Sequence, residues 1–502
     1  RIGQGIEFDY CSVHAVWAIE KAGYQSIIIN NNPETVSTDF DTAGKLYFEP
    51  LYIEDVYNVI RKEMPKGVIV QFGGQTAINL APKLLKRGVQ ILGTSVDSID
   101  VAEDRKLFEQ LLKELNIPQP KGCAVTHMDE AVKVAEEIGY PVLVRPSYVI
   151  GGRAMQVVYS EAELREYVKE ATSLSTEHPI LIDQYIEGKE VEVDAISDKE
   201  DILIPGIMEH IERTGIHSGD SICVYPPQTL SQKVIDTLVL YTQKIAKALQ
   251  VIGLMNIQFV VKDEKVYVIE VNPRASRTVP ILSKVTKIPM VYVAVKVILG
   301  EKLRDQGYGV GLYNKSNLVA VKAPVFSFQK LNNVDVALTP EMKSTGEVLG
   351  VDSVYEKALV KAFSGAGYTF PGSGKILVSL RKKDRKEAAE LLKSFKEIGF
   401  ELIGTEGTAK YLAEHGLEVN PISINKLEEI YEMMKNKEIT VVINTPTLGK
   451  NPNKNGFKIR TTAEQMKVPC FTSLDTAKAY LLALKTYNKK EPFTYETLDY
   501  YM

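Results

Sequence analysis

The first hundred residues of the chain alternate short apolar runs with amphipathic stretches. Apolar runs rich in β-branched residues predict strands at residues 26–30, 67–72 and 89–93. Stretches with apolar residues at helical spacing predict helices at residues 12–22, 53–63 and 76–86. Strands and helices that alternate in this way are typical of a parallel α/β sheet.

The pattern changes at about residue 101. Helices are predicted at residues 103–115 and 128–138, and the apolar segment 140–146 predicts a strand that contains Arg145. A charged side chain among apolar residues costs several kcal/mol unless it is paired. Arg145 therefore forms either an internal ion pair or a contact with an anionic ligand.

Two turns carry paired glycines next to a strand. Gly151 and Gly152 lie in the loop 147–155, where glycine lets backbone amides approach a phosphate, although a hairpin turn is the more common reason for such a pair. Residues 73–76, Gly-Gly-Gln-Thr, follow a strand and open a helix. They fit an anion site at a helix N-terminus or, more simply, a tight turn.

The candidate chemistry lies where an apolar strand meets a polar turn. Side chains alternate along a strand, so Glu270 and Asn272 face the same way, and Gln258 in a neighbouring apolar run can add a third oxygen ligand for a divalent metal. Arg274 and Arg277 follow, and guanidinium groups bind phosphate oxygens in a bidentate way. This combination predicts a site for a metal and a polyphosphate. The alternative is a strand that ends in an ordinary polar turn.

Two further segments carry candidate nucleotide contacts. The strand at residues 180–186 ends in a turn, and such a segment can bind an adenine edge through its backbone while Glu190 accepts from ribose hydroxyls. The alternative for Glu190 and for Glu192 is a solvated strand face. His217 lies between two glycines in a polar loop, where a histidine is more often a hydrogen-bonding group than a catalyst.

Composition narrows the class of protein. At 502 residues the chain has room for about three domains. The net charge of −4 and the scattered lysines give no sign of nucleic-acid binding. The four cysteines show no CxxC or Cys/His spacing, which argues against a disulfide framework or a zinc site and indicates a reducing cytoplasm. No apolar run reaches the roughly 18 residues of a membrane span, so no membrane partner is expected.

Three motifs occur in an order that resembles the ATP-grasp fold. They are residues 144–155 (VRPSYVIGGRAM), 215–221 (GIHSGDS) and 270–280 (EVNPRASRTVP), and residues 1–11 (RIGQGIEFDYC) fit the same pattern. Within that fold they are similar to the large-subunit family of carbamoyl phosphate synthetase, which holds two homologous synthetase halves. RPSYVIGG and Arg-Thr-Val-Pro resemble the second half, so the resemblance implies that the chain phosphorylates carbamate with ATP.

The resemblance implies roles for individual residues and for ATP, Mg²⁺ or Mn²⁺, and K⁺ as cofactors. The implied metal ligands are Gln258, Glu270 and Asn272, and the implied catalytic residues are Arg274, Arg277 and His217, with the two arginines holding the phosphoryl group and the carbamate. The implied ATP contacts are Arg105, Arg145, Gly151, Gly152, Gln184, Ile186, Glu190, Gly215, Ile216, His217, Ser218, Gln258 and Glu270. Because phosphoryl transfer depends on alignment and charge neutralisation, loss of one arginine should lower mainly kcat. The glycine loop would close as a lid over carbamate, which decomposes in water.

The last part of the chain predicts a separate domain. A glycine-rich linker at residues 363–374 precedes strands at residues 375–380 and 439–443, and residues 398–409 predict a strand that leads into a helix with threonines at the turn. Together these segments resemble the methylglyoxal-synthase-like domain, which implies a bound nucleotide effector. The implied effector contacts are Arg385, Thr405, Thr408, Asn444 and Thr445.

The chain departs from the family pattern in two places. Segment 422–427 is shorter than usual and does not clearly place the expected lysine, so the effector is not identified. Glu212 and Asp220 match two acidic positions of the ornithine site of some members, but the third position is Ala323, so ornithine activation is not expected. Methylglyoxal synthase activity is not expected either, because these turns show no acidic catalytic pair.

The sequence thus predicts an α/β protein of three domains. They are a pre-ATP-grasp Rossmann-like domain (1–100), an ATP-grasp domain (101–365) with a lid at about 125–195, and a methylglyoxal-synthase-like doubly wound domain (366–502). The chain begins in a glycine-containing turn, so we expect a strand to precede it in the full protein.

The resemblance implies a glutamine-hydrolysing enzyme of pyrimidine and arginine biosynthesis. Its implied partners are the first synthetase half, a small glutaminase subunit and the nucleotide effector. Two alternatives remain. One is another ATP-grasp ligase, such as a biotin-dependent carboxylase or a purine-pathway enzyme, and the other is a nucleotide-sensing regulatory protein.

Overall fold

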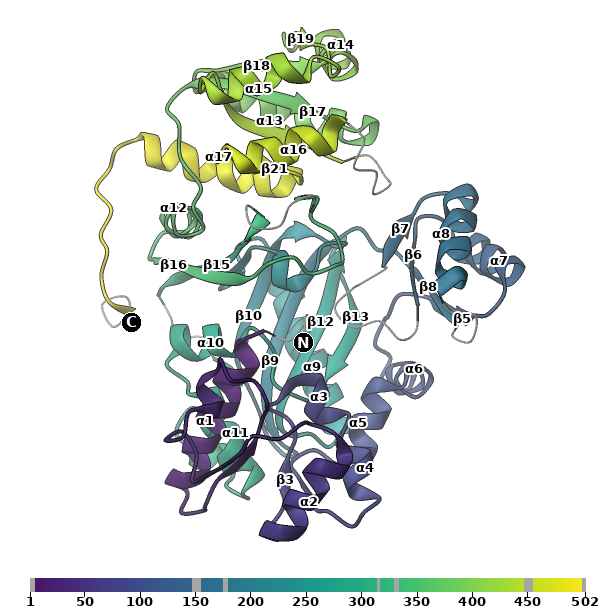
Figure 1. The fold of residues 1–502 in the computed structure, drawn as a ribbon, viewed down its shortest axis with the longest axis vertical. Helices are drawn as coiled ribbons and strands as arrows, with labels where there is room; N and C mark the ends of the chain where they lie inside the picture. The colour runs from purple at the N-terminus through teal and green to yellow at the C-terminus, as the bar shows by residue number, and fades with distance from the viewer. Residues whose placement is uncertain are drawn as a thin grey trace. The chain divides into compact units, whose positions relative to one another are not determined.

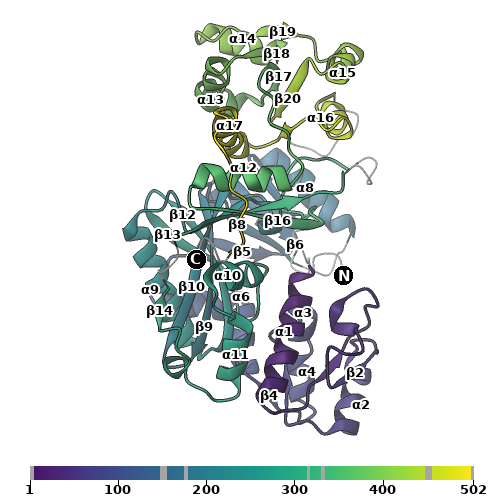
Figure 2. The ribbon, with the colours of Figure 1, turned by 90° about the vertical axis from the view of Figure 1, so that its left-hand side faces the viewer.

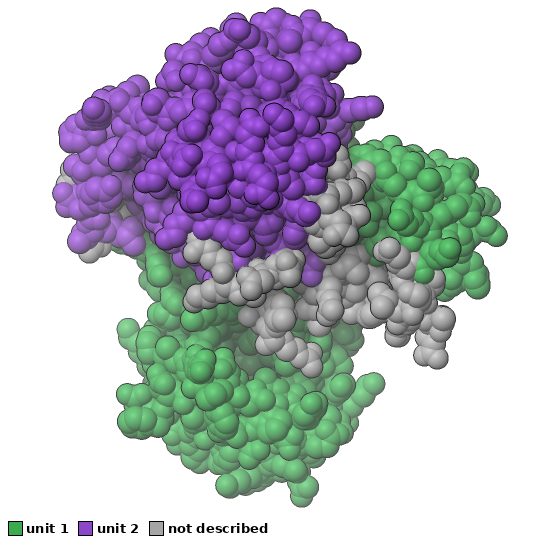
Figure 3. Space-filling view, turned by 45° about the horizontal axis from the view of Figure 1, so that its top comes forward, with its two compact units in different colours: residues 1–209, 225–316 green, residues 210–224, 317–502 purple. Residues whose placement is uncertain are grey.

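The computed structural model describes residues 5–146, 155–174, 179–313, 317–328, 334–446 and 455–498. The chain divides into two compact units (Figure 3). Unit 1 consists of residues 1–209 and 225–316, and unit 2 consists of residues 210–224 and 317–502. The chain therefore passes between the two units three times.

Two small parallel sheets form the N-terminal part of unit 1, as the alternation of strands and helices predicts. β1 (Ile27–Ile29) pairs with β2 (Lys45–Tyr47), and β3 (Val68–Ile69) pairs with β4 (Ile91–Leu92). The helices of this part are α1 (Glu7–Lys21), α2 (Ile53–Glu63), α3 (Gly74–Ile78), α4 (Ala81–Leu85) and α5 (Val96–Glu103), with a 3₁₀ turn η1 (Val36–Thr38). The predicted helix at residues 53–63 is confirmed, and α1 begins five residues before its predicted start.

The predicted single helix at residues 76–86 is wrong, because two short helices, α3 and α4, occupy this segment. Pro82 lies in the first turn of α4. Proline has no amide hydrogen, and its ring clashes with the carbonyl four residues earlier, which here belongs to Ile78, the last residue of α3. The helix therefore stops at Ile78 and a new one begins at Ala81.

The next part of unit 1 is a four-stranded antiparallel sheet with three helices. Its strands are β5 (Gly122–Val125), β6 (Val142–Pro146), β7 (Gln156–Val158) and β8 (Ile180–Gln184), in the order β5-β8-β6-β7. The helices are α6 (Arg105–Glu114), α7 (Met128–Ile138) and α8 (Glu161–Leu174). α6 begins two residues after its predicted start because Asp104 is its N-cap and accepts hydrogen bonds from the amides of Lys106 and Leu107, each at 2.9 Å.

The largest sheet of unit 1 carries the candidate metal site. Its strands are β9 (Lys189–Asp198), β10 (Ile202–Arg213, which continues into unit 2), β12 (Ile252–Lys262), β13 (Lys265–Asn272) and β14 (Gly311–Leu312), with the order β13-β12-β9-β10 and β14 paired to β10 (Figure 1). The remaining helices are α9 (Gln232–Ala248), α10 (Val279–Thr286), α11 (Met290–Ile298) and the 3₁₀ turn η3 (Leu303–Asp305). Alternation directs Val193, Ile257 and Val268 to one face, where they pack with Leu238 of α9 in a hydrophobic core, and leaves polar residues on the opposite face.

Unit 2 begins with short elements and ends in a five-stranded parallel sheet. The first elements are η2 (Ser218–Asp220), β11 (Cys223–Tyr225), β15 (Val319–Val325), β16 (Gly346–Asp352) and α12 (Tyr355–Gly365), which packs on β15 and β16 (Figure 2). The parallel sheet has the order β19-β18-β17-β20-β21. Its strands are β17 (Gly374–Ser379), β18 (Phe400–Thr405), β19 (Asn420–Ile422), β20 (Ile439–Asn444) and β21 (Cys470–Phe471).

Helices cover both faces of this parallel sheet, which confirms the predicted doubly wound fold. The helices are η5 (Lys382–Asp384, a 3₁₀ turn), α13 (Arg385–Glu397), α14 (Glu406–Glu414), α15 (Leu427–Lys435), α16 (Asn455–Gln465) and α17 (Leu474–Asn488). Ile376 and Val378 pack in the core that contains α13 and α17, whereas Leu377 packs in the core that contains α15 and α16 (Figure 2). Strands buried on both faces are typical of parallel sheets.

The predicted linker at residues 363–374 begins too early. Phe363 and Gly365 belong to the last turn of α12. Phe363 is only 1% exposed, and its ring packs edge-on against Tyr480 with the centroids 5.6 Å apart. Helix α12 therefore continues to Gly365, because the apolar face of the helix is still buried at Phe363.

Gln71 connects the N-terminal part of unit 1 to its largest sheet. Its buried side chain donates to Thr94 Oγ1 at 2.9 Å and to the Ile252 carbonyl at 2.8 Å, and its Oε1 accepts from the Leu254 amide at 3.1 Å. Gly253 lies within this contact at φ +102°, and a Cβ there would lie 2.2 Å from Gln71 Oε1. Only glycine fits this position.

Gly253→Ala should destabilise β12 more than Gly23→Ala destabilises its own turn. Both glycines have positive φ, +102° and +85°, where alanine costs roughly 1 kcal/mol. Nothing lies within 4 Å of a Cβ at Gly23, whereas the Gly253 variant also breaks the hydrogen bond from Leu254 to Gln71, for roughly 1–3 kcal/mol more. Hydrogen exchange of the β12 amides measures the difference. Equal loss of protection in both variants would contradict this role of Gln71.

Candidate functional site

Two rows of polar side chains cross β9, β12 and β13. The first row is Glu192, Gln258 and Glu270, and the second row is Asp194, Asn256 and Asn272. Asn272 Nδ2 donates to Glu270 Oε1 at 3.0 Å, so these two side chains lie on the same face, as their spacing predicts. The structure therefore brings the three predicted metal ligands together at one end of the sheet.

A bulge in β13 keeps the polar and apolar faces separate. The register shifts so that Glu270 pairs with Gln258, whereas Val268 pairs with Phe259. Ile269 is the extra residue, and its side chain is 40% exposed. Without the bulge, strict alternation would place Val268 on the face of Glu270 instead of in the core.

Arg274 lies directly beside the predicted ligands. It donates to Asn272 Oδ1 at 3.1 Å and to Gln75 Oε1 at 3.3 Å. Gln75 lies in the first turn of α3 and donates in turn to Glu103 at 2.7 Å, so the glycine turn before α3 supports an arginine. Burial lowers the pKa of Arg274, and the nearby Glu270 carboxylate opposes this shift.

A buried acidic pair, Glu192 and Asp194, lies next to the predicted ligands. The solvated strand face expected as the alternative for Glu192 is wrong, and Asp194 was not predicted as a site residue. Asp194 and Glu192 are 1% and 4% exposed, and the Thr278 hydroxyl contacts both carboxylates. Asn256 Nδ2 donates to Asp194 at 3.1 Å. Burial raises the pKa of Asp194 to about 6, although hydrogen bonds from Ser276 and Thr278 offset part of the shift. Asp194 follows Glu192 by two residues, so alternation along the strand places both on one face. This spacing could have identified Asp194 from the sequence.

The predicted ligand set suits Mg²⁺ bound together with phosphate oxygens. Mg²⁺ is usually held by one or two carboxylates and completed by water and substrate phosphates. Glu270 supplies the carboxylate, and Gln258 and Asn272 supply amide oxygens. Asn272 Oδ1 accepts from Arg274 and, as an amide oxygen with two lone pairs, keeps one lone pair for a metal. Over the described residues, no group of three His, Cys, Asp or Glu side chains is placed to hold a metal ion.

Arg105 and Arg145 share the carboxylate of Asp183. Arg105 donates to Asp183 Oδ1, and Arg145 Nε lies 3.8 Å from Oδ2. Of the two alternatives for Arg145, the internal ion pair is thus present, and 38% of the Arg145 side chain remains exposed. Asp183 lies 78 residues from Arg105, and no local sequence pattern indicates the contact.

Gln184, Ile186 and Glu190 lie on the chain segment that leads from β8 into β9. Gln184 exchanges backbone and side-chain hydrogen bonds with Lys121, at 2.7 and 3.4 Å. Ile186 and Glu190 are each 8% exposed, so the alternative of a solvated strand face is wrong for Glu190. The other two predicted contacts of this unit, Gly151 and Gly152, lie outside the described residues.

The predicted contacts Gly215, Ile216, His217 and Ser218 belong to unit 2. His217 precedes η2, and its backbone amide donates to the Thr339 carbonyl at 2.9 Å. Its Nδ1 accepts from the Gly219 amide at 3.0 Å. The histidine is therefore at least a hydrogen-bonding group of its loop, which is one of the two interpretations of the sequence.

The predicted effector contacts meet where β17, β18 and β20 end. Thr405 Oγ1 donates to Thr408 Oγ1 at 3.2 Å, Thr408 Oγ1 accepts from the Leu380 amide at 3.1 Å, and Arg385 donates to the Leu380 carbonyl at 3.3 Å. Asn444 is the last residue of the neighbouring strand β20, where it pairs in register with Ser379, and Thr445 follows it. Ligands of doubly wound sheets bind at the carboxyl ends of the strands.

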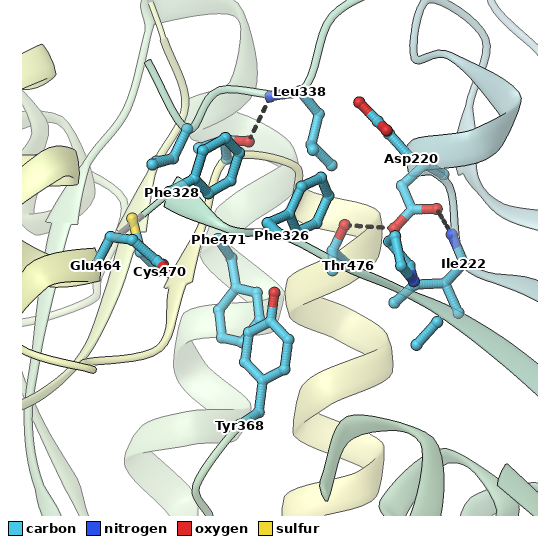
Figure 4. Close-up of a pocket in the computed structure, with 15 residues that line it drawn as sticks. Asp220, Ile222, Phe326, Phe328, Leu338, Tyr368, Glu464, Cys470, Phe471 and Thr476 are labelled. Carbon is cyan, nitrogen blue, oxygen red and sulfur yellow. Dashed lines mark hydrogen bonds between the residues drawn. The ribbon is translucent and has the colours of Figure 1, made fainter. Parts of the chain in front are cut away.

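A cavity of about 40 Å³ in unit 2 contains Glu212, Asp220 and Ala323 among its lining residues (Figure 4). Glu212 accepts from Thr476 Oγ1 at 2.7 Å and from the Ile222 amide at 2.8 Å, and burial raises its pKa. Asp220 accepts from the amides of Lys343 and Ser344 at 2.8 and 2.9 Å. Both carboxylates thus have protein donors.

No helix in the described parts of the chain is long and apolar enough to cross a bilayer. All four cysteines are free thiols.

Comparison with protein families assigns most of unit 1. The model described as the carbamoyl phosphate synthase preATP-grasp domain matches residues 1–101, and the model described as the carbamoyl-phosphate synthase L chain, ATP binding domain, matches residues 104–306. An MGS-like domain model matches residues 387–472. The chain is also 59% identical, over all 502 residues, to the carbamoyl phosphate synthase large chain of Clostridium acetobutylicum, and covers 47% of that protein.

The chain belongs to the carbamoyl-phosphate synthase large-chain family. It spans about half the length of the curated relative and corresponds to its C-terminal half.

Solved structures support the ATP-grasp fold of this family member. The biotin carboxylase domain of Hydrogenobacter thermophilus 2-oxoglutarate carboxylase, solved with MgADP, ADP and bicarbonate, has a TM-score of 0.57 at 19% identity and covers 72% of this chain and 88% of that chain. Biotin carboxylase from Campylobacter jejuni has a TM-score of 0.53 at 21% identity, with 64% and 74% coverage. At these identities the similarity concerns the fold alone.

Asp194→Asn should remove a pH dependence of stability between about pH 4 and pH 6. The pKa of Asp194 is raised in the fold from 3.8 to about 6, so the folded state binds more protons than the unfolded state in this window, and stability falls as pH rises. The shift of about two units corresponds to roughly 3 kcal/mol. Hydrogen exchange of β9 amides at pH 4 and pH 8 measures it. A wild-type and a variant protein with the same pH dependence would contradict the shift.

Proposed function

We propose that this chain phosphorylates carbamate with ATP and releases carbamoyl phosphate and ADP, as the second synthetase half of a glutamine-hydrolysing carbamoyl phosphate synthetase. One observation carries the proposal. Gln258, Glu270 and Asn272 lie in adjoining rows of one polar face, and Arg274 binds Asn272 beside them. A single carboxylate, two amide oxygens and a guanidinium suit Mg²⁺ and a transferring phosphoryl group.

Each part of this site has a distinct task. Gln258, Glu270 and Asn272 would hold Mg²⁺, which would neutralise charge on the ATP phosphates. Arg274 and Arg277 hold the transferring phosphoryl group and the carbamate anion. Since phosphoryl transfer needs little covalent work from the protein, alignment and charge neutralisation supply most of the catalysis.

The remaining predicted ATP contacts bind the phosphates, the adenine and the ribose of the nucleotide. Arg105 and Arg145 bind phosphate oxygens by their accessible edges while Asp183 orients both guanidinium groups. Gln184 and Ile186 line adenine, and buried Glu190 accepts from the ribose. Gly215, Ile216, His217 and Ser218 complete the nucleotide and carbamate side, with Gly151 and Gly152 in the lid.

We also propose three domains for this chain. They are the pre-ATP-grasp domain (1–100), the ATP-grasp domain (101–365) and the methylglyoxal-synthase-like domain (366–502).

We also propose partners and a cellular location for this protein. The first synthetase half supplies carbamate, a glutaminase subunit supplies ammonia, and the product feeds pyrimidine and arginine biosynthesis in the cytoplasm. The likeness to the C-terminal half of a longer chain supports the first partner. Four free cysteines suit a reducing compartment.

The back reaction tests this proposal with the chain by itself. Supplied with ADP, carbamoyl phosphate and Mg²⁺, the protein should form ATP, which luminescence detects. No ATP would overturn the proposal. Formation of an acyl phosphate from ATP and a different acid would identify another ATP-grasp ligase, and nucleotide binding without either reaction would identify a regulatory protein.

Glu270→Gln should abolish ATP formation in this assay, with a loss of at least about a thousandfold in kcat, because the only carboxylate among the three ligands is neutralised. Nucleotide binding by the C-terminal domain should persist. The matched control is Glu264→Gln, in the turn between β12 and β13, where the carboxylate accepts from Ser231 Oγ at 2.6 Å. The proposed site would be wrong if the Glu270 variant lost ATP formation and C-terminal nucleotide binding equally, or if the control lost ATP formation.

We further propose that the C-terminal sheet binds a nucleotide effector through Arg385, Thr405, Thr408, Asn444 and Thr445. Thr405 is the N-cap residue of α14, so the first amides of this helix and the two threonine hydroxyls face the same region as the ends of the strands. Such a position suits a phosphate. Lys426 pairs with Glu429 at 3.0 Å and is not part of the proposed contact set.

Thr408→Val should weaken binding of the effector while ATP formation continues. Loss of one hydrogen bond to a charged phosphate should raise Kd at least about tenfold. Titration calorimetry with a panel of nucleoside monophosphates measures this effect. Thr440→Val, on β20 of the same sheet, is the control, because its hydroxyl only approaches the Ser373 carbonyl at 3.4 Å. Equal weakening in both variants would contradict the proposed contact.

A further inference from the structure

A buried lysine holds the turn that follows His217. Lys322 lies on β15 and is 3% exposed. Its Nζ donates to three carbonyl oxygens of the turn, those of Ser218, Gly219 and Ser221, at 3.2, 3.2 and 3.0 Å. Three carbonyls that converge on one ammonium group are a compact cation site built from backbone, and the protein fills it with its own side chain.

The amides at the other ends of the same peptide groups are also bonded. The Gly219 amide donates to His217 Nδ1 at 3.0 Å, and the Asp220 amide donates to the His217 carbonyl at 2.8 Å. The Ile222 amide donates to Glu212 Oε2 at 2.8 Å. Each peptide group whose oxygen binds Lys322 therefore has its N–H bonded as well, so the ammonium group orients the amide that binds the histidine ring.

This arrangement fixes the tautomer of His217. A ring nitrogen that accepts a hydrogen bond carries no proton, so in the neutral imidazole the proton lies on Nε2. The Gly219 peptide also fixes the orientation of the ring. In this tautomer the donor of the ring is Nε2–H, and a donor of this kind suits an anionic oxygen of a nucleotide or of carbamate.

We propose that Lys322 is a positioning residue for nucleotide binding, acting through the His217 turn; this inference rests on the proposed function for the role of His217. Lys322 does not touch the substrate. Its charge aligns the Ser218–Gly219 and Gly219–Asp220 peptide groups, and these hold His217 as the Nε2–H tautomer. Loss of the charge lets the turn relax and releases the ring from its orientation.

Kinetics of the back reaction test the positioning role. Lys322→Met keeps the length of the side chain and removes its charge, and it should raise the KM for ADP about tenfold with a smaller fall in kcat. Lys322→Arg should recover part of the loss. The matched control is Lys361→Met. It removes another lysine of unit 2, which donates to the Val351 carbonyl at 2.8 Å and pairs with Asp352 at 2.9 Å, and it should leave the KM for ADP unchanged.

The hydrogen bonds from Lys322 to the turn and from the Gly219 amide to His217 are called the clamp here. Nitrogen NMR of the histidine rings tests this clamp independently of activity. The chain has six histidines, so a His217→Asn variant assigns the His217 signals. Wild type should show Nε2 protonated and Nδ1 unprotonated, and Lys322→Met should shift these signals whereas Lys361→Met should not. If wild type forms no ATP, the proposed function fails, and the tautomer and its response to Lys322→Met still decide whether the clamp exists.

Three results would overturn the inference. One is a wild-type His217 with its proton on Nδ1. Another is a Lys322→Met protein with unchanged KM and unchanged His217 signals. The third is unfolding of both Lys322 variants, judged by circular dichroism, because Lys322 would then be a residue of general stability.

Discussion

The antiparallel register of β9, β12 and β13 is the constraint on which the proposed metal site depends. A shift by one residue in any of these strands would exchange its polar and apolar faces. Val268 and Val193 would then leave the core, and Glu192 and Glu270 would enter it. Burial of the apolar face therefore fixes the site, with the bulge at Ile269 correcting the phase of β13 just before the ligands begin.

The same register concentrates negative charge that needs compensation. Glu192 and Asp194 are buried side by side, and Glu270 lies in the row of Glu192. The raised pKa of Asp194 shows that its ionised form is costly in this environment. Arg274 provides one compensating charge, and a divalent cation at Glu270 would provide another. A cation and a phosphate bound at this face would therefore favour each other, because each would reduce the cost of the other's charge.

Local periodicity could be predicted from the sequence, and distant pairing could not. The helix at residues 128–138 and the shared face of Glu270 and Asn272 follow from spacing alone. The interruption before Pro82 follows from proline chemistry that outweighs a helical apolar pattern. The partners of Arg105 and Lys322, by contrast, lie 78 and more than 100 residues away, where no local pattern reports on them. Family motifs indicated the candidate site residues but not the distant side chains that contact them.

Unit 2 contains a continuous set of hydrogen bonds between the proposed effector contacts and the turn of His217. Arg460 donates to Asn444 Oδ1 at 3.0 Å and to Asp335 Oδ1 at 2.9 Å. Lys343 Nζ donates to the Asp335 carbonyl at 2.9 Å, and the Lys343 amide donates to Asp220 at 2.8 Å. A ligand that binds Asn444 Oδ1 would share this oxygen with Arg460 or replace it. A continuous set of hydrogen bonds does not by itself couple two binding sites. Coupling also requires an element with two arrangements whose populations are changed by both ligands. The Asp335–Lys343 segment has the contacts that such an element needs, since one of its ends binds Arg460 and the other binds Asp220.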